Sequence, residues 1–286
     1  MNNYLQVVDQ IKRKSSFLIV GLDSDYSKFP PNVQFPDVEL AIMRFNKAII
    51  EATAAYAVGY KLNSAFYECH GIAGLKALRD TVRYIKEKYP EMLVILDAKR
   101  GDIGNTSACY ARAAFDSFQA DAVTVAPYMG YDSVEPFLRY KDKWTILLAL
   151  TSNKGSADFQ QLLTKDETFV FENVLRTASK WELHSDTMNA EQMMFVVGAT
   201  QADWFKKIRQ IVPDHFLLVP GVGAQGGSLR AVVENGINRE FCCLLVNASR
   251  SIIFASKDDN FAMAAAHKAA EMQKEMSDLL KEFTLI

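Results

Sequence analysis

The stretch LVILDAKRGDIGNT (residues 93–106) shows the unit from which the fold is built. The apolar run LVIL leads directly into a charged segment that includes Asp97, Lys99 and Asp102. A run of Val, Ile and Leu without polar alternation is typical of a strand buried on both faces, as in a parallel sheet. The charges that follow either form a soluble turn or belong to a chemical site, and the rest of the chain must decide which.

Similar apolar runs recur along the whole chain, and helical patterns lie between them, such as the 4, 3, 4, 3 spacing of apolar residues from Val38 to Ala52. Eight such strand and helix units predict a (β/α)8 TIM barrel, formed as a single domain by residues 1–286. A doubly wound open sheet is the alternative, because periodicity does not report closure. The predicted strands are FLIVGLD (17–23), GYKLN (59–63), LVILDAK (93–99), AVTVAP (122–127), WTILLALT (144–151), MFVVGAT (194–200), FLLVPGVG (216–223) and FCCLLVN (241–247).

Three further helices are expected outside this regular pattern. The segment NYLQVVDQIKRK (3–14) is expected to close the bottom of the barrel, and a long amphipathic helix near 260–283 to finish the chain. The segment 152–192 is longer than its counterparts, and we expect one helix in it around 165–184.

The bulk composition describes an ordinary globular chain and limits the classes of partner. The chain has 286 residues, 49% hydrophobic and 23% charged, with a net charge of −2, so it lacks the basic footprint of a nucleic-acid-binding protein. Its apolar runs are too short for a signal peptide or a membrane span. The four cysteines form no CxxC pair and the four histidines no metal-ligand pattern, which favours reduced thiols, no metal and a cytoplasmic location.

Polar side chains stand where several predicted strands end. In (β/α)8 barrels the carboxyl ends of the strands carry the chemistry. A single polar residue at such a place is more often a loop charge or a helix cap, but a set that converges on one face favours a site. The set comprises Asp23, Lys61, Asn63, Asp97, Lys99, Ser152, Gln225 and Arg250.

Asp97 and Lys99 are two positions apart, so on a strand both side chains leave the same face. If that face points into the barrel, a lysine there loses solvation and needs carboxylate partners to stay protonated. Asp97 and Asp102 are the expected partners, and Lys61 on the neighbouring strand would extend the array. A buried ion-pair network that serves stability alone is the less favourable reading. A protonated lysine held in this way is a general acid.

A glycine-rich segment, PGVGAQGG (220–227), follows the seventh strand, and NASRSI (247–252) follows the eighth. Phosphate groups often bind in barrels at the last two loops, on backbone N–H groups. Gly221 and Gly223 would let the backbone approach the phosphate, while Gln225 and Arg250 would supply side-chain donors. The sequence therefore predicts a site for a phosphorylated ligand.

Together these residues resemble the orotidine 5′-phosphate decarboxylase family, in its longer subfamily. The most specific part is DAKRGDIGNT, which matches the family pattern D-x-K-x-x-D-I, and the resemblance covers essentially the whole barrel. The segments VGLD (20–23), YKLN (60–63), TSN (151–153), PGVGAQGG and SRSI agree with it in order and strand position.

The resemblance implies decarboxylation of orotidine 5′-phosphate to UMP in pyrimidine biosynthesis, without a metal or cofactor. Lys99 is similar to the lysine that protonates C6 of the pyrimidine, Asp97 to the residue beside the substrate carboxylate, and Lys61 to the residue that completes the charged array. The other matching residues imply contacts to the ribose (Asp23, Asn63), the pyrimidine edge (Ser152) and the phosphate (Gln225, Arg250). Family members are homodimers with shared sites, and Asp102 and Thr106 occupy the positions that reach into the partner.

Two other functions stay open at this point. A magnesium-dependent sugar-phosphate decarboxylase or aldolase shares D-x-K-x-x-D but needs a carboxylate where this chain has Lys61. A non-catalytic barrel that binds a phosphorylated ligand would have no use for the Lys99 array. In the long 152–192 segment, Lys154 and Gln160 are either surface residues or part of a lid.

Overall fold

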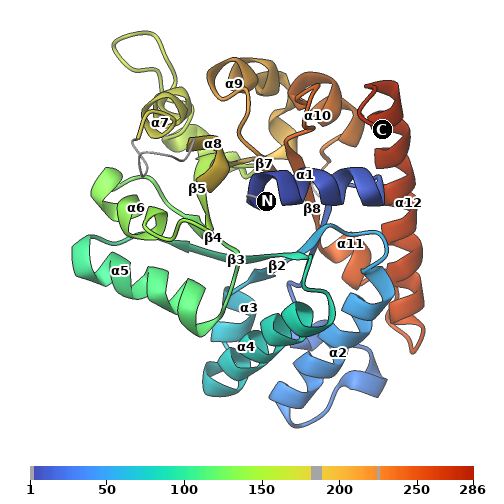
Figure 1. Cartoon of the computed structure of the whole chain (residues 1–286). Coiled ribbons are helices and arrows are strands. Elements are labelled where there is room, and N and C mark those ends of the chain that lie inside the picture. Colours follow the sequence, from blue (N-terminus) through green and yellow to red (C-terminus); the bar gives the residue numbers. More distant parts are fainter. Residues whose placement is uncertain (1–2, 182–188, 224–225) are drawn as a thin grey trace.

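The computed structural model describes residues 3–181, 189–223 and 226–286, and its strands close into a barrel (Figure 1). Eight parallel strands pair in sequence order, and the first pairs with the last through Ile19 and Asn247. The predicted TIM barrel is confirmed, and the open sheet is excluded. The strands are β1 (Leu18–Gly21), β2 (Gly59–Asn63), β3 (Leu93–Arg100), β4 (Ala122–Val125), β5 (Trp144–Leu150), β6 (Met193–Val197), β7 (Leu217–Pro220) and β8 (Leu244–Ala248).

Helices surround this barrel and connect its strands. The long helices α2 and α4 lie side by side, and α12 packs against α2 and α11. The described helices are α1 (Asn3–Lys14), α2 (Val38–Thr53), α3 (Ala65–Glu68), α4 (Gly71–Lys88), α5 (Gly104–Arg112), α6 (Tyr131–Leu138), α7 (Val170–Ala178), α8 (Asn189–Gln192), α9 (Phe205–Ile211), α10 (Leu229–Gly236), α11 (Arg250–Ile253) and α12 (Phe261–Glu282). None of the helices in the described ranges combines the length and the apolar character that crossing a membrane requires.

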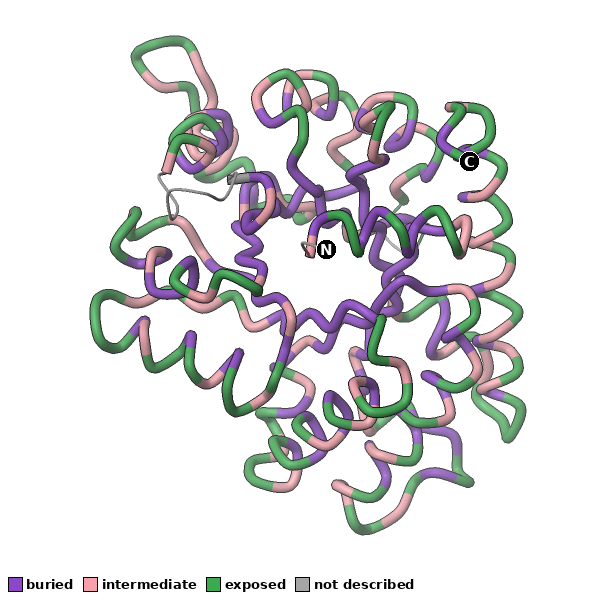
Figure 2. Tube along the Cα trace, in the orientation of Figure 1, coloured by how far each residue is buried: buried purple, intermediate pink, exposed green. Residues whose placement is uncertain are grey.

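The strands form a largely buried ring, and most exposed residues lie on the outer faces of the helices and in the loops (Figure 2). All residues of β1, β4, β6 and β8 are buried, which explains why their sequences lack alternation. The inner and outer faces of the strands thus belong to one continuous hydrophobic core.

Helix α1 lies across the amino end of the barrel, as expected (Figure 1). It buries Tyr4, Val7, Val8 and Ile11 there. At its last residue, the ammonium of Lys14 donates hydrogen bonds to the carbonyl oxygens of Ala54 and Ala57, 2.6 Å and 2.8 Å away. The amino end is therefore closed, and the opposite end is left for the site.

Two sequence-based expectations about local structure were wrong. The helix expected around 165–184 begins only at Val170, because residues 163–169 form a hairpin whose turn places Glu167 at a φ of 55°. It ends at Ala178, and residues 182–184 of the expected span lie outside the described residues. The strand expected over 241–247 begins at Leu244, since Cys242 and Cys243 both adopt positive φ angles that a strand excludes.

Candidate active site

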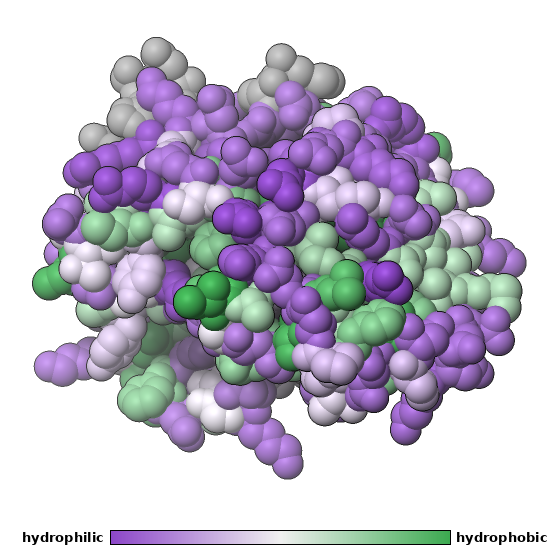
Figure 3. Space-filling view, turned by 90° about the horizontal axis from the view of Figure 1, so that it is seen from below, coloured by the Kyte–Doolittle hydropathy of each residue, from purple (hydrophilic) through white to green (hydrophobic). Residues whose placement is uncertain are grey.

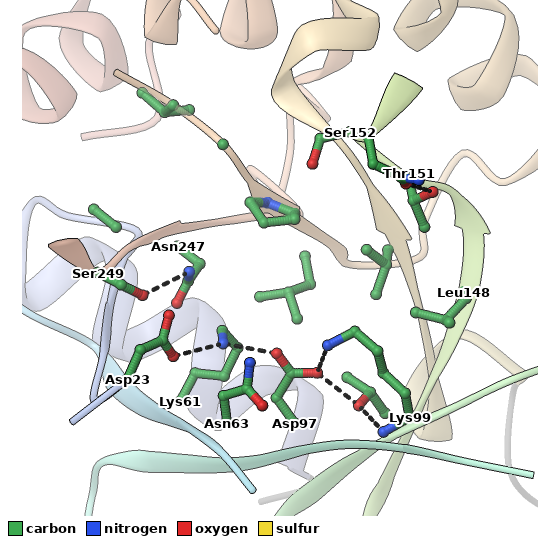
Figure 4. A pocket seen from close by; sticks show the side chains of 18 of the residues that line it. Asp23, Lys61, Asn63, Asp97, Lys99, Leu148, Thr151, Ser152, Asn247 and Ser249 are labelled. Carbon is green, nitrogen blue, oxygen red and sulfur yellow. Dashed lines mark hydrogen bonds and ion pairs between the residues drawn. The ribbon is translucent and has the colours of Figure 1, made fainter. Parts of the chain in front are cut away.

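A cavity of about 390 Å³ opens at the carboxyl ends of the strands. Residues from all parts of the chain line it, from the ends of β1 and β2 to the ends of β7 and β8 (Figure 4). The structure brings most of the predicted site residues together here: Asp23, Lys61, Asn63, Asp97, Lys99, Ser152, Gly221 and Arg250.

A row of alternating charges forms one wall of the cavity. The ammonium of Lys61 lies 2.8 Å from Oδ2 of Asp97 and 3.6 Å from Oδ1 of Asp23. On the other side of the same carboxylate, Nζ of Lys99 lies 2.6 Å from Oδ1 of Asp97. Asp97 therefore stands between two ammonium groups, and Figure 4 shows the row from Asp23 to Lys99 along the cavity.

Lys61 and Lys99 differ in burial, and the buried one is not the lysine that the sequence predicts. The side chain of Lys61 is 5% exposed and that of Asp97 is 10% exposed, whereas that of Lys99 is 50% exposed. We had expected Lys99 to be the desolvated lysine, and this was wrong. Lys61 points into the barrel core, while Lys99 reaches over the cavity, where a ligand would contact it.

The buried pair is held ionised by mutual attraction. Burial alone would lower the pKa of Lys61, but the neighbouring carboxylates of Asp97 and Asp23 raise it above its ordinary value. Burial alone would raise the pKa of Asp97, but Lys61 and Lys99 hold it well below its usual range. Lys61 and Asp97 therefore both stay charged near neutral pH.

The backbone of Lys99 adopts an uncommon conformation for a residue with a side chain, with a φ of 48°. The register between β3 and β4 shifts between Leu96 and Arg100, so the strand bulges at the charged residues. The buried hydroxyl of Thr124 on β4 holds this bulge, because it accepts the N–H of Lys99 at 2.9 Å and donates to Oδ1 of Asp97 at 2.9 Å. The sequence analysis did not include Thr124 in the site. The one indication was that Thr124 is the single polar residue in the apolar strand AVTV (122–125).

The glycine-rich loop and the start of α11 form the other end of the cavity. Gly221 directly follows β7 and adopts a φ of 97°, a conformation that favours glycine, and Arg250 is the first residue of α11. Gly223 does not line the cavity, and its N–H donates to the carbonyl of Gly227. Gln225 lies outside the described residues. The part of the predicted phosphate site that the structure describes is therefore Gly221 with Arg250.

Asp102 and Thr106 do not line the cavity of their own chain. Oδ1 of Asp102 accepts the N–H of Ile103, and among the described residues Asp97 is the only carboxylate within 4.0 Å of the Lys99 ammonium. A single chain thus brings together three members of the expected array and leaves Asp102 apart.

Comparison with known proteins shows what the chain is similar to. Residues 16–266 match the model of the orotidine 5′-phosphate decarboxylase / HUMPS family. The chain belongs to this family. It is 54% identical to an orotidine 5′-phosphate decarboxylase of Porphyromonas gingivalis over 98% of this chain and 99% of that protein, and 55% identical to one of Bacteroides fragilis over 98% of each. The solved structure of the Leishmania donovani OMP decarboxylase matches with a TM-score of 0.80 and 34% identity, covering 98% of both chains.

In this member of the orotidine 5′-phosphate decarboxylase / HUMPS family, an ammonium group fills the space where a metal ion would bind. Lys61 lies between the carboxylates of Asp23 and Asp97, which are the oxygen donors that Mg²⁺ would need. Across the described ranges, no three His, Cys, Asp or Glu side chains gather as a metal site. The residues present therefore do not fit a magnesium ion at this place.

Ser152 lines the cavity after β5 and is fixed by its neighbours. The side chain of Gln160 accepts the N–H of Thr151 at 2.7 Å, so the long segment folds back onto the end of β5. Thr200 donates to the carbonyl of Ser152 at 3.1 Å, and a Cβ on Gly198 would come within 2.6 Å of Ser152. Gln160 is thus half-buried against the end of β5, whereas Lys154 is an exposed surface residue.

Proposed function

We propose that this chain decarboxylates orotidine 5′-phosphate to UMP without a metal or cofactor, and that Lys99 is the proton donor. The observation that carries the proposal is the Lys61–Asp97–Lys99 row, in which the exposed ammonium of Lys99 reaches over the cavity. The names of the relatives that match nearly the whole chain support the same reaction.

The chemistry requires a positive group next to a carbon that becomes negative. When the bond between C6 and the carboxylate carbon breaks, the electron pair stays on C6 and CO₂ leaves. No carbonyl of the pyrimidine is placed to delocalise this pair, so fixed charge must stabilise it. The Lys99 ammonium provides that charge and then transfers a proton to C6, which leaves UMP and a neutral amine that solvent reprotonates.

Asp97 has two roles in this proposal. Its carboxylate holds the ammonium of Lys99 in place at 2.6 Å, and it faces the carboxylate that the substrate loses. Two carboxylates that face each other repel, which would destabilise the bound substrate relative to the transition state. Lys61, buried behind Asp97, keeps the pKa of that carboxyl low so that the repulsion persists.

Phosphate binding at the far end of the cavity holds the substrate against this wall. Arg250 and Gly221 are the described residues of the proposed phosphate grip, and we assign Gln225 to it as well. Asp23 and Asn63 would contact the ribose and Ser152 the pyrimidine edge. Binding energy from a group remote from the reacting carbon can offset strain at that carbon.

Turnover of orotidine 5′-phosphate by the purified protein tests the proposal directly. The expected result is loss of pyrimidine absorbance that is unchanged by EDTA. Activity on a sugar phosphate that disappears with EDTA would instead support the magnesium-dependent function. Binding of UMP without turnover of orotidine 5′-phosphate would support the non-catalytic barrel.

We further propose a homodimer in which Asp102 and Thr106 complete the site of the partner. The segments that follow β2, β3 and β4 carry exposed apolar side chains, among them Ile72 (76% exposed), Ile103 (54%) and Tyr128 (91%), and Ile103 is the direct neighbour of Asp102 in the chain. Figure 3 views the side on which α2 and α4 lie and shows apolar side chains that interrupt a mainly hydrophilic surface. A second copy would cover such a patch and bring its own carboxylate to each site.

Hybrid dimers test this assignment. Lys99→Ala and Asp102→Ala proteins are each expected to be inactive, and mixing them should restore about a quarter of wild-type activity. Half of the dimers would be hybrids, and each hybrid would contain one intact site. Native mass spectrometry of differently tagged chains verifies exchange. If hybrids form without any recovery, Asp102 serves the site of its own chain.

We place this single-domain protein in the cytoplasm. Cys69 and Cys109 are exposed thiols, which persist where the surroundings are reducing. The pairing of β1 with β8 supports one domain, because the barrel closes only when both ends of the chain take part.

A further inference from the structure

One polar side chain in the cavity has no role in the proposed mechanism. Asn247 stands on β8 at the cavity wall and is only 7% exposed. Its amide nitrogen donates a long hydrogen bond of 3.4 Å to the hydroxyl of Ser249. Its amide oxygen accepts no hydrogen bond from any residue in the described part of the chain.

The backbone of β1 is shaped to admit this amide. A Cβ on Gly21 would lie 3.1 Å from Oδ1 of Asn247 and only 1.8 Å from the hydroxyl of Ser249. The absence of a side chain at Gly21 therefore lets both polar groups sit against the strand end. Asp23, two residues further along, also has a buried oxygen, Oδ1, that no described residue hydrogen-bonds. Figure 4 shows the Asn247 amide next to this carboxylate.

An unpaired amide oxygen at this depth is unfavourable in the empty protein. Leaving a buried polar atom without a partner costs about 1–3 kcal/mol. Other buried side-chain atoms of the described residues also lack a hydrogen bond, among them Oε1 of Gln10 and Oγ of Ser133, but these residues lie away from the cavity, whereas Asn247 lines it. An apolar side chain of similar size would avoid this cost. The position therefore indicates a partner that arrives with the ligand.

The place of Asn247 in the cavity indicates which part of a nucleotide that partner belongs to. Arg250, three residues further along the chain, marks the phosphate end, and the Asp97–Lys99 pair marks the pyrimidine end. Asn247 on β8 and Asp23 just after β1 stand on the part of the barrel wall that runs from β8, which leads to Arg250, through β1 and β2 to β3, which carries Asp97 and Lys99. The group that joins phosphate to base is the ribose, and its hydroxyls are the donors available there.

We propose that the amide of Asn247 hydrogen-bonds a ribose hydroxyl and makes the site selective for ribonucleotides over the corresponding deoxynucleotide. A hydroxyl can both donate and accept, so the assignment holds for either orientation of the amide group. The inference rests on the proposed function, because it takes the ligand to be a pyrimidine ribonucleotide. It adds a specificity residue that the charged row does not supply.

Calorimetric binding of UMP, 2′-deoxy-UMP and 3′-deoxy-UMP to the wild-type protein and to Asn247→Ala tests this inference. The wild-type protein should bind UMP about tenfold more tightly than the form lacking the contacted hydroxyl, the factor that one hydrogen bond supplies. In Asn247→Ala that preference should fall below about threefold, while affinity for the deoxy form changes little. The matched control is Asn153→Ala, which removes an amide from the same cavity at β5 and should keep the preference.

The outcomes separate the inference from the proposed function. If wild-type protein binds no UMP, the proposed function itself fails. If it binds UMP but Asn247→Ala weakens all three nucleotides by the same factor, Asn247 only supports the wall and the inference is overturned. An unchanged preference in Asn247→Ala overturns it as well. Asn247→Ser, with a small polar side chain, provides a second variant should the alanine protein melt at a lower temperature.

Discussion

Charged groups lie at both ends of the barrel, but the two ends differ in how many hydrogen bonds those groups make within the protein. At the amino end, the guanidinium of Arg209 on α9 donates to five backbone carbonyls, those of Val212, Pro213, His215, Gly236 and Cys243. Lys14 is tied to two more carbonyls. At the carboxyl end, Lys99 has one carboxylate partner and half of its side chain remains exposed, while the amide oxygen of Asn247 accepts no hydrogen bond from the described residues.

This difference separates structural charges from functional ones. Arg209 uses its donors within the fold, so it fixes the loops before β7 and β8 and offers little to a ligand. The groups around the cavity keep donors and acceptors for a molecule that is absent from the free protein. For the charged groups, therefore, the extent to which their hydrogen-bonding capacity is used within the fold, rather than burial or charge alone, distinguishes the two ends.

The largest expected effect is at the functional end. Lys99→Ala should lower kcat by about 10⁴-fold, roughly 5.5 kcal/mol, because the proton donor and the charge beside C6 are both lost. UMP affinity should change by less than about tenfold, since the phosphate grip is intact. Steady-state kinetics and calorimetry measure the two quantities.

Lys154→Ala removes an exposed lysine near the same strand ends and serves as the matched control, with turnover close to wild type. A Lys99→Ala protein that retained more than about a tenth of wild-type kcat, a loss below about 1.4 kcal/mol, would refute the proton-donor role.

The corresponding change at the amino end should affect stability instead of turnover. Arg209→Met leaves several carbonyls without their donor, and we expect the free energy of unfolding to fall by roughly 4 kcal/mol. Denaturant unfolding at a fixed protein concentration measures it. Arg79→Met, at a side chain that is 52% exposed, should change stability by less than about 0.5 kcal/mol. Equal effects of the two substitutions would break the comparison.

A pH effect should follow from His215, which lies beside Arg209. Burial, together with the positive charge of Arg209, lowers the pKa of His215 from 6.5 to about 4. The unfolded chain therefore takes up this proton at a higher pH than the folded protein, so stability is complete above pH 6.5 and is lost as the pH falls toward 4. The loss between pH 7 and pH 4.5 should be roughly 2.5 kcal/mol.

His215→Gln isolates this contribution, because the variant has no proton to take up at that position. Its unfolding free energy should depend less on pH than that of the wild-type protein over the same window. Identical pH dependence in the two proteins would show that His215 is not held neutral by the fold.

The smallest expected effect concerns Thr124, whose hydroxyl joins the backbone N–H of Lys99 to the carboxylate of Asp97. Thr124→Val keeps the shape but removes the hydroxyl between the Lys99 N–H and Asp97, and kcat should fall by about 10–30-fold, roughly 1.5–2 kcal/mol. Thr124→Ser keeps the hydroxyl and should stay within about threefold of wild type. The positioning role is wrong if the valine variant matches the serine variant in kcat.

The sequence predicted the barrel because its strands are buried on both faces and leave an unbroken apolar signal. It also predicted the charges at the ends of β2 and β3, since a lysine and an aspartate after an apolar strand have few other uses. It misjudged which lysine is buried, because two-residue spacing assumes a regular strand and β3 bulges before Lys99. Pattern alone does not reveal a bulge.

Other features depend on contacts between distant segments. Gln160 lies in the middle of a segment without a recognisable pattern, and only the fold shows that it holds Thr151. Asn247 is the first residue of the NASRSI segment (247–252). The feature that draws attention to it is an amide oxygen without a hydrogen bond from the described residues, and this can be seen only in the fold. The positive φ angles of Cys242 and Cys243 likewise replace an expected strand by an irregular turn.

The pairing of β1 with β8 has a consequence for synthesis of the protein on the ribosome. Asp23 emerges with the first strand, whereas Asn247 and Arg250 emerge with the last, after more than two hundred residues of intervening chain. Strand β1 stays without one of its two neighbours until then, with its backbone open to wrong partners. The nascent chain therefore has no complete ligand site that UMP could stabilise until β8 and Arg250 have emerged.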